Sequence, residues 1–262
     1  MFRKLFRILG LAKCRTAATD AASASERGLV RRENQDNLLV NREAGVFCVA
    51  DGMGGGEGGA KASEIVCAAI AASTAAVADM QGRVRQVTEA VENANSEIQA
   101  YAERAGYRQM ATTVAALVFD PAGRREAALG YVGDSRLYRL RSGGLEQLSH
   151  DHTIAAELMR RKPGDADAEA SASRAGKLSH VLTRAVGIEP DVQMEWTMVD
   201  VRPGDRFLLC TDGLYDMVSG SGIRRAMASG GKCTAVVEKL REMVFARGAI
   251  DNFTIIAIDA RG

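Results

Sequence analysis

Apolar and polar positions along this chain recur with two different periods, which divide it into strands and helices. Alternating or continuously apolar segments within 16–40 and at 46–49, 112–120, 127–134, 136–141, 192–199, 206–210 and 253–259 predict strands. Apolar positions three and four residues apart predict two long successive helices over 60–80 and 84–101, and shorter ones over 223–228 and 234–246. Strands, then two adjacent helices, then strands and helices again is not the alternation of a parallel sheet. The order predicts an α+β fold in which helices cover antiparallel sheets.

Two segments stand outside this pattern. Residues 1–15 mix large apolar side chains with basic ones, which is typical either of an amphipathic helix on an anionic membrane surface or of a disordered leader. Residues 152–180 hold a short helical piece followed by small and polar residues, which suits a surface insertion near a site as well as a plain linker. The chain from 16 to 262 is otherwise predicted to form a single domain.

Composition narrows the class of function. A hydrophobic content of 47% in 262 residues is ample for a sizeable core, and a net charge of +1 gives no field that favours nucleic acid. Five cysteines without a C-x-x-C pair argue against a disulfide framework or a thiolate zinc site and indicate a reducing compartment. Three histidines without an H-E-x-x-H motif argue against a zinc hydrolase. No run approaches the roughly 20 apolar residues that a membrane span needs.

Aspartates occur where four of the strands end or begin. Asp51 follows V-F-C-V-A and precedes a glycine-rich stretch, Asp134 follows Y-V-G, Asp212 follows F-L-L-C-T, and Asp251 opens D-N-F-T-I-I. Clustered glycines cost backbone entropy on folding, so they indicate that something approaches the backbone closely. Converging carboxylates repel one another unless cations neutralise them, and such hard oxygen ligands prefer Mg²⁺ or Mn²⁺. Two such ions about 3.5–4 Å apart can activate a water for in-line attack at phosphorus.

Eight motifs, in this order, resemble those of one enzyme family. They are R-G-L-V-R-x-E-N-Q-D, V-A-D-G-M-G-G-G-x-G-G, M-A-T-T, Y-V-G-D-S-R-L-Y, L-S-H-D-H, L-T-R-A-V-G, P-G-D-R-F-L-L-C-T-D-G-L and D-N-F-T, between about Ala18 and Ala260. The chain resembles the metal-dependent serine/threonine protein phosphatases of the type 2C class, in their bacterial branch. The resemblance implies a four-layer α-β-β-α sandwich, two antiparallel sheets flanked by helix pairs, with a dinuclear metal site at one end.

The resemblance also implies which residues bind metal. Asp51 would bridge two Mn²⁺ or Mg²⁺ ions, and the Gly52 carbonyl would bind one of them. Asp212 and Asp251 would complete the shell of the first ion. Asp134 together with Asp212 matches the position of a weaker third ion in bacterial members.

Two further residues would act on water and substrate. Asp36, in N-Q-D, would orient a metal-bound water. Arg31 matches the arginine that holds the substrate phosphate, for which a forked guanidinium is well suited. Arg32 is the obvious competitor, but one residue further along an extended segment it would point away.

Other matching positions have less direct roles. Asn252 either hydrogen-bonds near the metals or caps the start of a strand. Asp151 is expected to form a structural ion pair, and Thr112 and Thr113 are expected to pack a strand beneath the site. The segment 152–180 matches the flap of the family.

The chain departs from the family pattern at two positions. Met53 stands where many eukaryotic relatives have the histidine proposed as the acid for the leaving alkoxide, so protonation of the leaving group would fall to metal-bound water. Gln35 replaces an acidic residue often found before the Asp of its motif, which removes a charge near the second metal.

Other functions explain the sequence less well. The spacing of Gly54, Gly56 and Gly59 spells a dinucleotide fingerprint, but a helix that ends near Asp79 and is followed by another helix leaves no βαβ unit. No cysteine has an arginine six positions on, as a cysteine-dependent phosphatase requires. A metal-dependent nuclease lacks the motif order. A metal-poor phosphoprotein-binding regulatory module is the fairest rival, yet it would lack one of the three central aspartates.

We therefore expect a protein phosphatase that hydrolyses phosphoserine and phosphothreonine by direct attack of a metal-bridging water. Its partners would be phosphorylated proteins, the targets of a serine/threonine kinase, and not nucleic acid. We expect a monomer in the cytoplasm, with contact of residues 1–15 with the inner face of the membrane left open.

Overall fold

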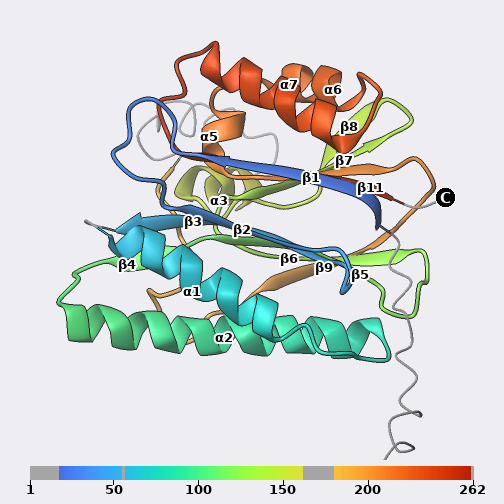
Figure 1. Cartoon of the computed structure of the whole chain (residues 1–262). Coiled ribbons are helices and arrows are strands. Elements are labelled where there is room, and N and C mark those ends of the chain that lie inside the picture. The colour runs from blue at the N-terminus through green and yellow to red at the C-terminus, as the bar shows by residue number, and fades with distance from the viewer. Residues whose placement is uncertain (1–17, 55–56, 162–179, 261–262) are drawn as a thin grey trace, which may run out of the picture.

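The computed structural model describes residues 18–54, 57–161 and 180–260, and these form two antiparallel sheets stacked between two groups of helices (Figure 1). The first sheet has the strand order β1 (Ala18–Glu26), β11 (Phe253–Ala260), β10 (Arg206–Cys210), β7 (Arg136–Arg141) and β8 (Gly144–Gln147). The second has the order β2 (Asp36–Asn41), β3 (Val46–Gly54), β5 (Val114–Phe119), β6 (Glu126–Val132) and β9 (Glu195–Asp200), and β4 (Met110–Thr112) pairs with β3.

Helices cover the outer face of each sheet. The helices α1 (Gly58–Ala72) and α2 (Met80–Ala105) lie on the second sheet, and α6 (Gly220–Met227) and α7 (Cys233–Phe245) lie on the first (Figure 1). Two further helices, α3 (Ile154–Arg161) and α5 (Asp212–Tyr215), complete the described elements. This arrangement confirms the predicted four-layer α-β-β-α sandwich. The leader 1–15 and most of the expected flap lie outside the described residues, so both stay predictions.

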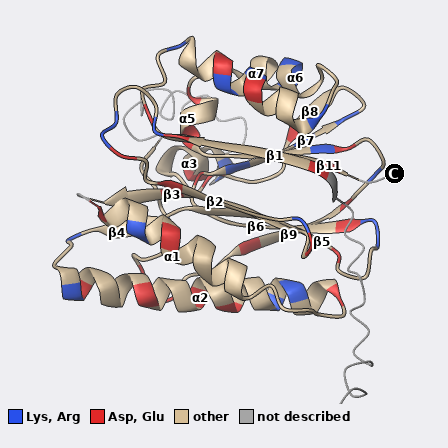
Figure 2. Ribbon diagram, viewed as in Figure 1, with Lys and Arg blue, Asp and Glu red and all other residues tan. Residues whose placement is uncertain are grey.

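The central strands are buried on both faces, which explains their continuous apolar runs. In β3, Phe47 and Val49 pack between the sheets, whereas Val46 and Cys48 pack under α1 and α2. The rings of Phe119 and Phe207, one from each sheet, meet edge to face with centroids 5.9 Å apart. Lys, Arg, Asp and Glu lie mainly on the helices and loops around these sheets (Figure 2).

The structure corrects several predicted boundaries. A helix was expected over 60–80, but α1 ends at Ala72, and Asp79 instead caps α2 by accepting a hydrogen bond from the Gly82 N–H at 2.7 Å. The helix expected over 84–101 is longer at both ends. The strand β9 starts at Glu195 rather than 192, and the sequence pattern did not reveal β8 or α5.

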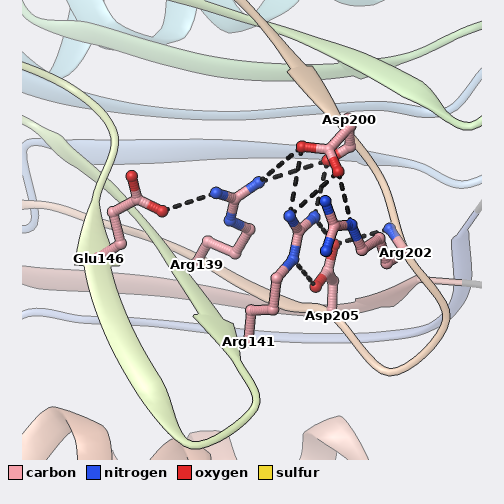
Figure 3. A network of polar contacts seen from close by, with 6 residues as sticks. All are labelled: Arg139, Arg141, Glu146, Asp200, Arg202 and Asp205. Atoms are coloured by element: carbon pink, nitrogen blue, oxygen red, sulfur yellow. Dashed lines mark hydrogen bonds and ion pairs between the residues drawn. The ribbon is translucent and has the colours of Figure 1, made fainter.

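A network of ion pairs joins the two sheets at the end opposite Asp134 (Figure 3). It comprises Arg139, Arg141, Glu146, Asp200, Arg202 and Asp205. Arg141 lies 2.6 Å from the buried carboxylate of Asp205 and 3.1 Å from Asp200. Because Arg141 ends β7 of one sheet and Asp200 ends β9 of the other, the network fixes the two sheets relative to each other.

Among the described helices, none is both long and apolar enough to cross a bilayer.

Candidate metal centre

The predicted metal-binding aspartates lie at one end of the sandwich because the strands that carry them end there. Asp51 lies in β3, opposite Asp36 at the start of β2 in the antiparallel register. Asp212 follows β10 at the start of α5, and Asp251 precedes β11, the antiparallel partner of β10. Asp134 lies in the turn between β6 and β7. Antiparallel pairing thus brings together carboxylates that are far apart in the sequence.

Two glycines allow the backbones at this end to touch. A Cβ at Gly52 would lie 2.0 Å from the carbonyl oxygen of Gly59 and 2.6 Å from that of Gln35. A Cβ at Gly213 would lie 2.0 Å from the carbonyl oxygen of Asn252. Neither position accepts a side chain unless the backbone shifts. The glycine-rich stretch was expected to admit something close to the backbone, and at Gly52 this is the chain's own backbone.

All the residues predicted to bind metal line one cavity of about 480 Å³. They are Asp51, Gly52, Asp134, Asp212 and Asp251, and Arg31 lines the same cavity. The structure therefore brings the predicted metal ligands and the predicted phosphate ligand together. Asp36 lies deeper, buried in the strand next to Asp51 and only 7% exposed.

Burial and mutual repulsion raise the pKa values of these carboxyl groups. For Asp51 the pKa is well above its usual range, because of desolvation first and then the charges of Asp36, Asp212 and Asp134. Desolvation, followed by repulsion from neighbouring carboxylates, raises the pKa of Asp134 to about 7 and also raises that of Asp212. Cations in the cavity would lower these pKa values, since an opposite charge nearby favours the carboxylate.

The donor set fits divalent metal ions. Asp36 Oδ2 accepts hydrogen bonds from the hydroxyls of Thr211 and Thr254, both at 2.8 Å, whereas Asp36 Oδ1 is buried without a hydrogen-bond partner among the described residues. Burial raises the pKa of Asp36 to about 7 despite these two hydrogen bonds. An orphaned carboxylate oxygen beside four oxygen-donor side chains is what an oxygen-coordinated ion and its water shell would satisfy.

Arg31 stands at the rim of the carboxylate cluster. Its Nη2 lies 2.5 Å from Asp251 Oδ2, and this hydrogen bond is the main reason that the pKa of Arg31 is raised. The segment around Arg31 and Arg32 is a turn and bend rather than the extended segment that was assumed, so the argument from alternation against Arg32 was wrong. The prediction of Arg31 instead rests on its contact with Asp251 and its place in the cavity wall.

Comparison with known families decides what kind of site this is. A family model for protein phosphatase 2C matches residues 27–244. The chain belongs to this family. The family predicted from the eight motifs is thereby confirmed.

Two proteins to which this chain is similar come from bacteria. The serine/threonine protein phosphatase PstP of Mycobacterium tuberculosis is 35% identical over 244 residues, which are 91% of this chain and 44% of PstP, so the chain spans less than half of that relative. A structure described as PppA, a key regulatory component of T6SS in Pseudomonas aeruginosa, has a TM-score of 0.82 at 32% identity and covers 93% of this chain and 99% of that one.

A two-metal site has a direct parallel in the phosphatase 2C family. The catalytic domain of the serine threonine protein phosphatase PstP has been solved in complex with two manganese ions, and it matches 92% of this chain and 98% of its own with a TM-score of 0.78 at 32% identity. The family match and this relative support the prediction of a two-metal site.

The structure also places the supporting residues of this family member. The Asn252 side chain joins two loops: its Oδ1 accepts from the Gln35 N–H at 3.0 Å, and its Nδ2 donates to the carbonyls of Arg27 and Glu33. The expected ion pair of Asp151 is confirmed, since Arg136 Nη2 lies 2.6 Å from its carboxylate. The structural roles of Thr113 and Thr112 are confirmed, because both hydrogen-bond the Asp51 backbone at 2.9 Å.

Sequence reasoning missed His180 at this site. A ring nitrogen of His180 lies within 4.8 Å of a carboxylate oxygen of both Asp134 and Asp212, and His180 lines the cavity together with Met53. Its Nε2 also lies 3.7 Å from Asp216 Oδ2. The segment K-L-S-H offers no periodicity or motif that could have signalled this position.

Proposed function

We propose that this chain is a Mg²⁺- or Mn²⁺-dependent protein phosphatase that hydrolyses phosphoserine and phosphothreonine. The observation that carries the proposal is the convergence of Asp51, Asp134, Asp212 and Asp251 in one cavity with Arg31 at its rim. The family and the names of its relatives support the same activity. The predicted rival, a metal-poor binding module, has no observation in its favour because none of the central aspartates is lost.

In this proposal, each residue acts on the ions, the water or the phosphate. Asp51, the Gly52 carbonyl, Asp212 and Asp251 would hold two divalent ions, and Asp134 with Asp212 would hold a weaker third. Bound ions would neutralise the carboxylates, attract the phosphate and lower the pKa of a water between them. Arg31 keeps four N–H bonds beyond the one directed at Asp251, and these suit the oxygens of a phosphate group.

Asp36 would act on the attacking water. Its Oδ2 accepts hydrogen bonds from Thr211 and Thr254. Oδ1 is thereby left to accept a hydrogen bond from that water and to orient the water toward phosphorus. Because Met53 has no proton to give, the leaving alkoxide would take its proton from water. No side chain is assigned to a covalent phosphoenzyme.

We also propose a cellular setting for this activity. The substrates would be phosphoproteins made by a serine/threonine kinase, and the enzyme would act as a cytoplasmic monomer. Residues 1–15 would either rest on the anionic inner face of the membrane or form a disordered leader.

The proposal is tested by substrate class. A phosphothreonine peptide and the diester bis(p-nitrophenyl) phosphate are offered to the Mn²⁺-loaded chain and to Asp51→Asn. We expect hydrolysis of the monoester peptide by the parental chain alone, with the diester cleaved poorly by both. Preferential cleavage of the diester would instead indicate a nuclease-like function, and an active Asp51→Asn variant would remove the assigned role of the metal centre.

A further inference from the structure

Large apolar side chains are exposed around the cavity. Eight such side chains are exposed among the described residues, and four of them line the cavity or are next in sequence to a residue that lines it. These four are Val30, Val181, Ile188 and Ile250. Single exposed apolar side chains are common, whereas a contiguous exposed apolar patch marks a place where a partner binds.

Three exposed side chains lie on the two segments that contribute Arg31 and Asp251 to the cavity wall, and we call them the apolar lip: Leu29, Val30 and Ile250. They are 64%, 66% and 54% exposed. Val30 directly precedes Arg31 and Ile250 directly precedes Asp251, so both lie one Cα step, about 3.8 Å, from a residue of the cavity wall. The hydrogen bond from the Leu29 N–H to the Ala249 carbonyl, 2.8 Å, joins the two segments that make the lip.

The backbone of the two segments that carry the lip is fixed by several contacts. Gly28 has a φ of +73°, and a Cβ there would lie 2.3 Å from the Asp251 carbonyl oxygen, so the two segments touch directly. Arg27 Nη1 donates to the Arg31 carbonyl at 2.6 Å, and the Asn252 side chain donates to the Arg27 carbonyl at 2.8 Å. A loop tied at so many points and still presenting apolar side chains to water is pre-organised for a contact.

A phosphorylated polypeptide bound at the cavity has to pass over its rim. When a phosphate group lies between the aspartates and Arg31, the residues before or after the phosphorylated one run over the cavity rim. An extended chain advances about 3.3 Å per residue, so a side chain that reaches the lip belongs to one of the first few neighbours of the phosphorylated residue. Polar neighbours would leave the lip exposed to water, whereas an apolar neighbour would bury it.

We propose that the apolar lip selects phosphoprotein segments that carry a large apolar residue within about three positions of the phosphorylated serine or threonine. This inference rests on the proposed phosphatase function and specifies its substrates. Arg31 would hold the phosphate while Leu29, Val30 and Ile250 bury the neighbouring side chain. The lip is thereby a specificity element and takes no part in the chemical step.

The first arm of the test uses the parental chain with Mn²⁺. A phosphothreonine peptide of glycine and serine is compared with peptides in which one leucine is placed at each position within three residues of the phosphothreonine. We expect kcat/KM to rise about tenfold at one or two of these positions, which is about 1.4 kcal/mol. Equal kcat/KM across the whole series would overturn the proposal.

The second arm uses variants of the lip. In Leu29→Ser, Val30→Ser and Ile250→Ser, we expect the ratio of kcat/KM for the best leucine peptide to that for p-nitrophenyl phosphate to fall about tenfold. Met198→Ser serves as the matched control, because Met198 is 53% exposed and is not part of the cavity wall. A fall of the ratio in Met198→Ser as large as in the lip variants would contradict the proposal.

The outcomes separate this inference from the proposed function. If the parental chain cleaves neither peptide nor p-nitrophenyl phosphate with Mn²⁺, the phosphatase function itself fails. If it cleaves both without a preference for leucine, only the lip proposal fails. A lip that instead joins two copies of the chain would show as a change of sedimentation in the serine variants with the peptide preference unchanged, which also overturns the proposal.

Discussion

Replacement of Arg31 by alanine separates binding of the phosphate from stability and from metal binding. The guanidinium contacts Asp251, and its charge is also felt by Asp212 and Asp51. A hydrogen bond to a charged group contributes about 1.5–3 kcal/mol when buried. Because the Arg31 side chain is 55% exposed, solvent screening places the free energy lost with each of its charged hydrogen bonds near the lower limit of this range.

We therefore expect Arg31→Ala to raise KM for a phosphothreonine peptide about tenfold, with a smaller change in kcat, since a contact made equally in the ground state and transition state acts on KM. The same change removes a positive charge beside the metal ligands. The Mn²⁺ concentration for half-maximal activity should therefore fall, by about threefold. Unfolding temperature should change little, because an exposed ion pair adds at most about 1 kcal/mol to stability.

The assay is steady-state phosphate release over a matrix of peptide and Mn²⁺ concentrations, with Arg31→Lys and Arg32→Ala alongside. Arg31→Lys should recover part of the lost affinity, because it keeps the charge but not the fork. Arg32→Ala is the matched control and should behave as the parental chain. An unchanged KM in Arg31→Ala, or an equal increase in Arg32→Ala, would refute the assignment of Arg31.

Three further predictions follow from the same structure. Gly213→Ala should destabilise the chain by more than about 1 kcal/mol in urea denaturation, because the new Cβ would meet the Asn252 carbonyl. Gly220→Ala is the control and should not destabilise the chain, since a Cβ at Gly220 would have no neighbouring atom within 4 Å. Equal stabilities of the two variants would contradict the close contact at Gly213. Burial lowers the pKa of His152 below 6.5, so the unfolded chain binds the proton more readily than the folded chain. The stability contributed by neutral His152 is complete above pH 6.5 and should fall as the pH drops from 6.5 toward the lowered pKa of the folded state. His152→Gln should weaken this pH dependence of the free energy of unfolding, measured by denaturation at two pH values, and an identical dependence would exclude His152 as its source. Mn²⁺ should raise the unfolding temperature of the metal-free chain, because it binds the folded carboxylate cluster, and Asp51→Asn should reduce that shift; a shift of equal size in both would place the ion elsewhere.

The fold could be predicted because its physical causes are local. Strands buried on both faces give apolar runs such as the one before Asp51, and amphipathic helices give a clear period. The end of α1 could not be read from periodicity, because alanine-rich sequence continues past Ala72. The stop signal was present in Asp79, whose side chain caps α2, but it was taken as the end of a helix.

The candidate site could be predicted in its members but not in its geometry. Repetition of an aspartate at the end or start of an apolar strand identified Asp51, Asp134, Asp212 and Asp251, and the motif order added Gly52, Asp36 and Arg31. Their convergence depends on register, as in the pairing of Asp36 with Asp51, which no single segment encodes. His180 carries no local signal at all, because its place is set by the tertiary path of the chain.

The central claim is that the converging aspartates hold the ions that make this chain a phosphatase. The most direct measurement is phosphate release from a phosphothreonine peptide by EDTA-treated protein, with Mn²⁺ or Mg²⁺ added back and Asp212→Asn measured alongside. We predict that activity is lost with EDTA, returns with either ion and stays at least about a hundredfold lower in Asp212→Asn, which corresponds to roughly 2.7 kcal/mol. Full activity in EDTA, or in Asp212→Asn, would contradict the account.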